Sequence, residues 1–177
     1  MGQHRIHIQC HAECRTGNGR PDSSPVPHSP RVTPGCLEQD KLNLSDDFTP
    51  GAVAAAAALF ADLVRIWEPD HAQLGTTAMY AALPLTRAAF ISWTSSKAYA
   101  EPESDREVSF PSGDGVLRIS RDWSVDGVMA LEKDLVALGA PTASALPRVQ
   151  DVPQFPDAIP PGLKDMDREV NLAPQSS

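Results

Sequence analysis

The sequence predicts an α+β domain, in which a small antiparallel sheet is packed by two helices, between a disordered N-terminal loop and a disordered C-terminal tail. Two segments repeat apolar residues every three or four positions, as amphipathic helices do, and the stretches between them are rich in strand-forming residues. Most of the 17 prolines in this chain of 177 residues lie outside those segments. One domain fits this length. We expect a poorly ordered N-terminal segment with one short strand at 1–36, the α+β domain at 37–140 and a proline-rich disordered tail at 141–177.

The N-terminal segment begins with one alternating stretch. Residues 5–10 place Ile6, Ile8 and Cys10 on one side of a short strand. Prolines then recur from Pro21 to Pro34, and a proline-rich stretch sustains neither a helix nor a central strand. We therefore expect a loop or disorder over 11–36, followed by a weak strand over 37–44.

The clearest element is a helix that runs from about residue 50 to Trp67. Thr49 offers a hydroxyl N-cap, Pro50 suits the first helical position and Pro69 stops the helix. Its apolar stripe consists of Val53, Ala56, Ala57, Phe60, Val64 and Trp67. This stripe is expected to pack on the sheet.

The stretch after this helix supplies the strands. Residues 72–83 fit either a short strand or a short helix, because helical spacing is interrupted by Gly75 and two threonines. Residues 88–94 are bulky and favour a strand. The stretches 108–110 and 116–120 flank Pro-Ser-Gly-Asp-Gly, in which Gly113 and Gly115 can adopt positive φ, so a hairpin is expected.

A second helix is expected to end at Leu138. Ser124 or Asp122 can cap its start, and Gly139 followed by Pro141 ends it. Its apolar stripe consists of Val128, Leu131, Leu135 and Leu138. No further periodic element follows, and the recurring prolines after residue 140 predict the tail.

The charge and the apolar runs limit the classes of function. With 15 Lys and Arg against 23 Asp and Glu, the formal net charge is −8, which repels phosphate and disfavours direct nucleic-acid binding. The longest apolar run, 52–60, is far shorter than the ~20 residues of a membrane helix, so no membrane association is expected. Residues 1–20 have no apolar run typical of a signal peptide. The three cysteines, Cys10, Cys14 and Cys36, suggest free thiols, and we expect a cytoplasmic protein.

Two groups of residues offer chemistry, and each has a plainer alternative. Zinc prefers thiolate and imidazole ligands, and His28 or Cys36 could close a site begun in the N-terminal strand, although polar histidines on the outer face of a strand explain the pattern as well. That cluster consists of His4, His7, Cys10, His11 and Cys14. In the pair Asp70-His71 the carboxylate could fix the imidazole tautomer, but adjacent side chains usually point apart and a loop-capping role is simpler.

No cofactor, metal or catalytic residue is expected. The chain lacks the motifs that place a nucleophile, cradle a phosphate or bind catalytic zinc. The acidic run from Glu101 to Glu107 lacks the ligand order of a calcium loop and reads as a solvated face. The large aromatic residues Trp67, Phe90, Trp93 and Trp123 are expected in the core or at its rim. We therefore do not expect an enzyme.

Residues 59–139 resemble the C-terminal half of immunity protein family 52, whose members occur beside bacterial toxins. The element Leu63-Val64-Arg65-Ile66-Trp67-Glu68-Pro69-Asp70 looks like that family's helix ending in Trp, an acid, Pro and Asp. Phe90-Ile91-Ser92-Trp93 and the glycine-led strand Gly115-Val116-Leu117 are similar to two later elements. Residues 1–46 do not share the resemblance.

The resemblance implies a non-enzymatic antidote that binds and neutralises a cognate toxin protein, in some systems a nuclease. An interface is expected on irregular backbone beside rigid elements, where charge gathers in two places. The residues selected on this basis are Trp67, Glu68, Asp70, His71, Glu101, Glu103 and Asp105. Two alternatives stay open: a small metal-binding or hydrolytic protein, and a truncated remnant without function.

Overall fold

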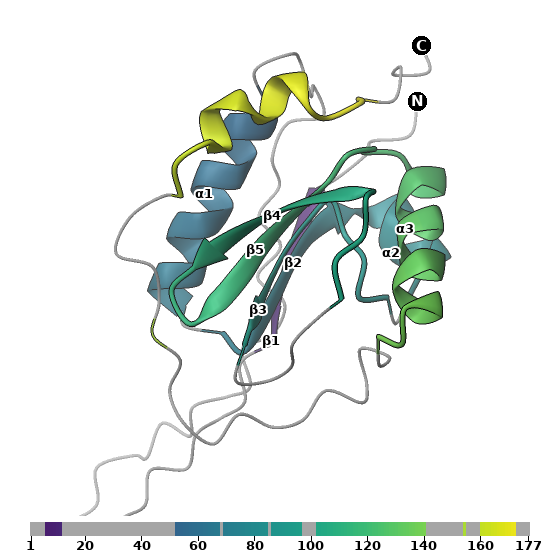
Figure 1. Ribbon diagram of the computed structural model, residues 1–177, viewed down its shortest axis with the longest axis horizontal. Coiled ribbons are helices and arrows are strands. Elements are labelled where there is room, and N and C mark those ends of the chain that lie inside the picture. The colour runs from purple at the N-terminus through teal and green to yellow at the C-terminus, as the bar shows by residue number, and fades with distance from the viewer. Residues whose placement is uncertain are drawn as a thin grey trace, which may run out of the picture.

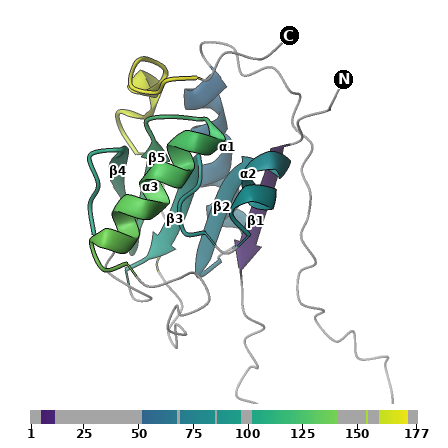
Figure 2. The same cartoon turned by 90° about the vertical axis from the view of Figure 1, so that its right-hand side faces the viewer.

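The protein has three layers, with a five-stranded antiparallel sheet between helices (Figures 1 and 2). The computed structural model describes the backbone of 6–11 and residues 52–67, 69–84, 86–96, 102–140, 154 and 160–172. Within these, the elements are β1 (Ile6–His11), α1 (Ala52–Trp67), β2 (His71–Thr76), α2 (Thr77–Ala82), β3 (Ile91–Ser95), β4 (Glu107–Ser112), β5 (Gly115–Ser120), α3 (Val125–Ala137) and the 3-10 helix η2 (Leu163–Arg168). The strand order is β1-β2-β3-β5-β4. The α+β class is confirmed.

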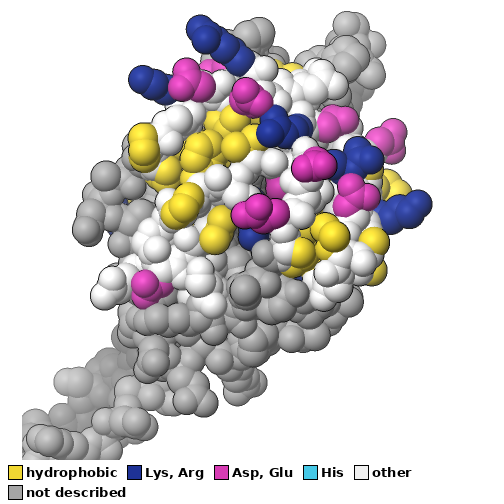
Figure 3. Space-filling view, in the orientation of Figure 1, with side chains coloured by type: hydrophobic (Ala, Val, Ile, Leu, Met, Phe, Trp, Pro, Cys, Tyr) yellow, Lys and Arg dark blue, Asp and Glu magenta, His cyan; other side chains and the backbone are white. Residues whose placement is uncertain are grey.

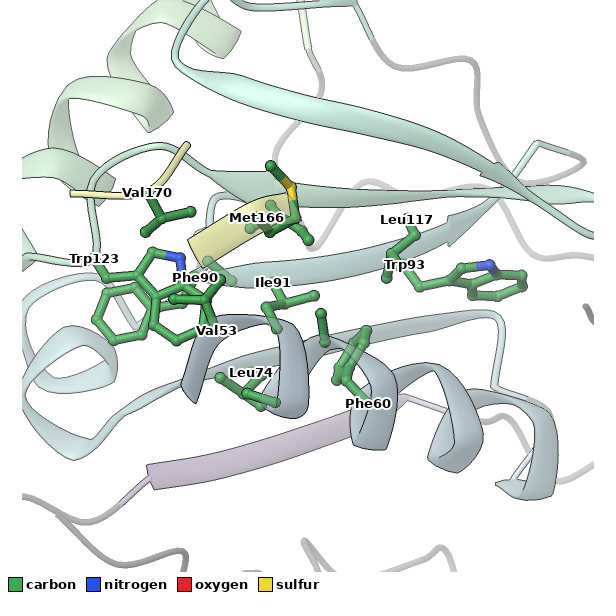
Figure 4. Close-up of a cluster of buried hydrophobic side chains, with 14 of the residues drawn as sticks. Val53, Phe60, Leu74, Phe90, Ile91, Trp93, Leu117, Trp123, Met166 and Val170 are labelled. Atoms are coloured by element: carbon green, nitrogen blue, oxygen red, sulfur yellow. The ribbon is translucent and has the colours of Figure 1, made fainter. Parts of the chain in front are cut away.

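One face of the sheet is apolar and is covered by α1 and η2. The register sets Leu74 beside Ile91 and Ile91 beside Ile119, so their side chains share this face. Phe60 of α1 and Met166 of η2 close over it, and both are at most 1% exposed (Figure 4). The apolar stripe predicted for the first helix is confirmed at Val53, Ala56, Ala57, Phe60 and Val64, all of which are buried.

The opposite face of the sheet is polar, although it is also buried. Gln73, Ser92 and Arg118 lie side by side across β2, β3 and β5, and none is more than 7% exposed. Gln73 Nε2 donates to the carbonyl oxygens of Thr86 and Arg87 at 3.0 and 2.8 Å. Because buried polar groups are costly unless hydrogen-bonded, this face requires specific partners from the segments around it. The helices α2 and α3 lie on this side (Figure 2).

The ambiguous stretch 72–83 contains both a strand and a helix. β2 ends at Thr76, whose hydroxyl accepts a hydrogen bond from the Met79 N–H at 3.2 Å and thereby caps α2. Met79 folds back onto Gly75, where an added Cβ would lie 2.2 Å from the Met79 Cε atom. The glycine that interrupts the helical pattern is therefore the residue that lets α2 pack against its own strand.

The predicted hairpin is confirmed as β4 and β5. Gly113 adopts a φ of 62° in the two-residue connection between Ser112 and Gly115. An added Cβ at Gly115 would lie 2.5 Å from the Trp93 ring, whose Nε1 donates to the Ser112 carbonyl oxygen at 3.2 Å. Pro111 is tolerated in β4 because β4 is the last strand of the described sheet and needs no donor on its outer side.

The second predicted helix is confirmed as α3, and its predicted stripe is buried at Val128, Leu131 and Leu135. The placement of Leu138 on that stripe is wrong: Leu138 follows the helix as its C-cap and is 54% exposed. Ser124 Oγ accepts a hydrogen bond from the Gly127 N–H at 2.9 Å, which decides between the two capping residues that the sequence offered. Gly139 adopts a φ of 89° after the helix ends. The predicted strands at 5–10 and 88–94 appear as β1 and β3, and the predicted weak strand at 37–44 lies outside the described residues.

Residues 160–172 correct the prediction of a disordered tail at those positions. Leu163, Met166 and Val170 are at most 9% exposed and belong to the hydrophobic core. The segment is also joined to the residues just before α3. The backbone N–H of Trp123 donates to the Asn171 carbonyl oxygen at 3.0 Å, and the backbone N–H of Asn171 donates to the Arg121 carbonyl oxygen at 2.7 Å. The sequence did not predict this because only three apolar residues lie along a charged segment, and the prolines around them favoured disorder. The rest of 141–177, apart from Gln154, lies outside the described residues.

A long-range cap joins this segment to α1. The Asp167 carboxylate oxygen Oδ1 accepts hydrogen bonds from the N–H groups of Val53 and Ala54 at 3.0 and 3.3 Å. A negative charge at a helix start also interacts favourably with the helix dipole. Thr49 and Pro50, which the sequence suggested for this end, lie outside the described residues.

We expect Asp167→Ala to destabilise the protein by about 1 kcal/mol, the usual cost of losing a helix cap. Asp165→Ala, which removes the same charge from an exposed position on η2, serves as the control and should cost much less. Urea unfolding followed by circular dichroism measures both. Equal losses in the two variants would show that the cap contributes nothing beyond its charge.

Candidate functional site on the outer face of α3

The predicted site residues around the end of α1 are mostly held inside the fold. Trp67 is half-buried and packs against the core. His71 is 4% exposed, and its Nδ1 lies 3.0 Å from the Thr94 hydroxyl oxygen. The backbone carbonyl oxygen of the half-buried Asp70 accepts a hydrogen bond from the Ser95 N–H. Glu68 lies outside the described residues. The described residues of this loop therefore mainly form contacts that hold β2 beside β3.

The predicted acidic run divides into an exposed part and a buried part. Glu103 and Asp105 are exposed, whereas Glu101 lies outside the described residues. Glu107 is 7% exposed and forms an ion pair with Arg118 at 2.6 Å. Glu107 thus belongs to the polar face of the sheet and is not part of a solvated acidic surface.

The structure does not bring the two predicted patches together. His71 pairs with Thr94, which pairs with Val116 at the beginning of β5. Glu107 pairs with Ser120 at the other end of β5, and Glu103 and Asp105 precede it. Four residues of strand separate the two ends by about 13 Å. The two predicted patches therefore lie toward opposite ends of β5.

A different surface, the outer face of α3, combines exposure with a rigid base. Glu132 on one flank of α3 accepts three hydrogen bonds at 2.8 to 3.0 Å, from the Thr86 hydroxyl and from the N–H groups of Arg87 and Ala88. On the other flank, Asp134 pairs with Arg106 at 2.6 Å. The inner side of α3 buries Val128, Leu131 and Leu135. The helix is therefore fixed on three sides, and its fourth side faces outward.

That outward side is unusually apolar. Met129 and Val136 are 47% and 54% exposed, and Leu138, directly after the helix, is 54% exposed. Among the residues that the structure describes, only one other large hydrophobic residue, Ile66 on α1, has comparable exposure. Scattered single hydrophobic residues on a surface need no explanation, but two on one face of a short helix make that face a candidate contact surface.

Charged residues lie on the outer face of α3 and on the turn 103–106, which the Arg106–Asp134 ion pair joins to the helix. The outer face of α3 and the adjoining turn carry four acidic residues and two basic ones, a net charge of −2. They are Glu103, Asp105, Asp126, Asp134, Arg106 and Lys133. Figure 3 shows hydrophobic side chains among magenta and blue ones on the side where α3 lies. An apolar centre with a charged rim is the usual composition of a protein-binding surface.

The sequence carries a signal for this face beside the predicted core stripe. Residues 126, 129, 130, 133, 136 and 137 form a second stripe, opposite the core stripe, and four of these six are apolar. A solvated helix face normally has mainly polar residues there. Only the tertiary structure, in which Val128, Leu131 and Leu135 are buried, showed that the second stripe is the exposed face of α3.

Within the described residues, no group of three or more His, Cys, Asp or Glu residues is arranged to hold a metal ion. His7, Cys10 and His11 of the predicted cluster lie on β1, of which the structure describes the backbone, and the remaining residues of that cluster lie outside the described part. No described helix is long and apolar enough to cross a membrane.

Comparisons with known proteins found no match to this chain among models of protein families, curated proteins or solved structures.

The buried pair on the polar face of the sheet gives a pH-dependent prediction. Burial raises the pKa of the Glu107 carboxyl above its ordinary value of 4.5, and this effect outweighs the opposing attraction of Arg118. A carboxyl group whose pKa is higher in the folded state binds its proton more tightly there. Its contribution to stability is therefore fully present below the unfolded-state pKa and is lost as pH rises through the folded-state pKa.

Glu107→Gln removes this titration and keeps the shape of the side chain. We expect the unfolding free energy of the wild-type chain, relative to that of Glu107→Gln, to fall as pH rises from about 4 to 7. Urea unfolding of both proteins at several pH values measures this difference. A difference that grows with pH would mean that the ion pair with Arg118 dominates over burial.

Proposed function

We propose that the protein is a non-enzymatic binding protein of bacteria that docks on a cognate toxin and neutralises it. The exposed apolar face of α3 is the observation that carries this proposal, because an apolar centre on a packed helix is a typical contact surface for another protein. The resemblance of residues 59–139 to immunity protein family 52 supports the same role. The protein would act in the cytoplasm, where such a toxin meets its targets.

The charge of the chain supports a basic partner. A toxin that acts on nucleic acid presents Lys and Arg to phosphate, and an acidic inhibitor can compete for the same cations. The net charge of −8 also repels nucleic acid from the inhibitor itself. A nuclease is therefore the class of toxin that this surface suits best.

The proposal is tested with the product of the adjacent reading frame. We expect that protein and the full chain to form a stable 1:1 complex in size-exclusion chromatography with light scattering, and we expect co-expression to restore growth of cells that produce the toxin. Association should weaken with added salt, because charges at an interface rim are screened. An unrelated toxin of similar charge is the control. A folded chain that neither binds its neighbour nor protects cells would refute the proposal.

A further inference from the structure

We infer that the outer face of α3 docks on a surface of the toxin that is apolar at its centre and basic at its rim. This inference rests on the proposed function and assigns the interface within it. It moves the interface from the predicted patch at the end of α1 to the outer face of α3, and it keeps Glu103 and Asp105, from the predicted patch before β4, in the rim.

The apolar centre is formed by Met129 and Val136. At 3.6 residues per turn these two residues lie on one side of α3, about two turns or 10 Å apart. Leu138, two positions after Val136, projects from a different side of the helix end and is not part of this centre. Two anchoring side chains are enough for a candidate interface, because a few residues commonly dominate the free energy of association.

The face is prepared for binding because α3 is held in place before a partner arrives. Ser124 caps its start, Glu132 binds the backbone of the segment 86–88, and Asp134 pairs with Arg106. These contacts come from three parts of the chain and fix the helix on both flanks. A surface that needs little reordering loses less free energy when it associates.

The rim decides what kind of partner fits. Glu103, Asp105, Asp126 and Asp134 outnumber Arg106 and Lys133, and the whole chain is acidic as well. A second copy of this chain would bring the same acidic rim against itself, because a two-fold interface repeats one surface on both sides. Like charges set against each other disfavour that pairing. The complementary occupant is a different protein with Lys or Arg around an apolar patch.

The test measures binding of the full chain to the product of the adjacent reading frame by calorimetry. Met129→Glu and Val136→Glu each place a charge in the apolar centre, and we expect each to raise Kd about tenfold or more. Ile66→Glu is the matched control: it makes the same change at the exposed hydrophobic residue on α1, and its Kd should stay within about twofold of the wild-type value. Urea midpoints equal to that of the wild-type chain establish that the variants fold.

The charge of the partner is tested with Lys133→Glu. This substitution makes the rim more acidic, so we expect tighter binding at low salt and a smaller gain as salt increases. Weaker binding at low salt would contradict a basic rim on the partner and overturn that part of the inference.

The outcomes separate the inference from the proposed function. A complex that forms with the wild-type chain and survives both α3 variants overturns the inference and leaves the proposed function standing. Loss of binding in Ile66→Glu alone would place the interface on α1 and likewise overturn it. No complex with the wild-type chain overturns both. A dimer of the chain alone in sedimentation equilibrium that Met129→Glu dissociates would assign the face to self-association and contradict the inference.

Discussion

Burial of both faces of one sheet is the constraint on which the rest of the structure depends. The face that carries Leu74, Ile91 and Ile119 is apolar and needs a cover that supplies only hydrophobic side chains. α1 provides most of that cover, and η2 completes it with Met166. Because η2 lies more than 90 residues after α1, this face of the sheet is fully covered only when the chain, near its C-terminal end, returns to α1. The hydrogen bond from the Val53 N–H to the Asp167 carboxylate holds η2 at the start of α1.

The polar face of the sheet imposes a different requirement. Gln73 and Arg118 are buried there and must be satisfied by hydrogen bonds and opposite charge. Arg118 is paired with Glu107, and Gln73 binds the backbone of the segment before β3. That same segment is bound by Glu132 of α3. The position of α3 is thus determined by polar contacts on its flanks as well as by its buried apolar stripe.

This mode of attachment is compatible with an exposed apolar face on α3. A helix held only by apolar packing turns its hydrophobic residues inward, and its outer face is polar. Because Glu132 and Asp134 help to hold α3 from its flanks, Met129 and Val136 can remain outside without loosening it. The role of a toxin inhibitor that we propose would use this outer face, and the acidic residues around it would favour a basic partner over a second copy of the chain.

The sequence by itself determined the class of the fold, both long helices and the hairpin, because these depend on local periodicity, capping residues and glycines at a turn. It could not resolve 72–83 into β2 and α2, since the role of Gly75 depends on Met79 folding back over it. Nor could it show that 160–172 join the core, that Glu107 is buried beside Arg118, or that the outer stripe of α3 stays exposed. The first and last of these depend on which elements pack against each other across the chain, and the burial of Glu107 and Arg118 depends on the elements that cover the polar face of their hairpin.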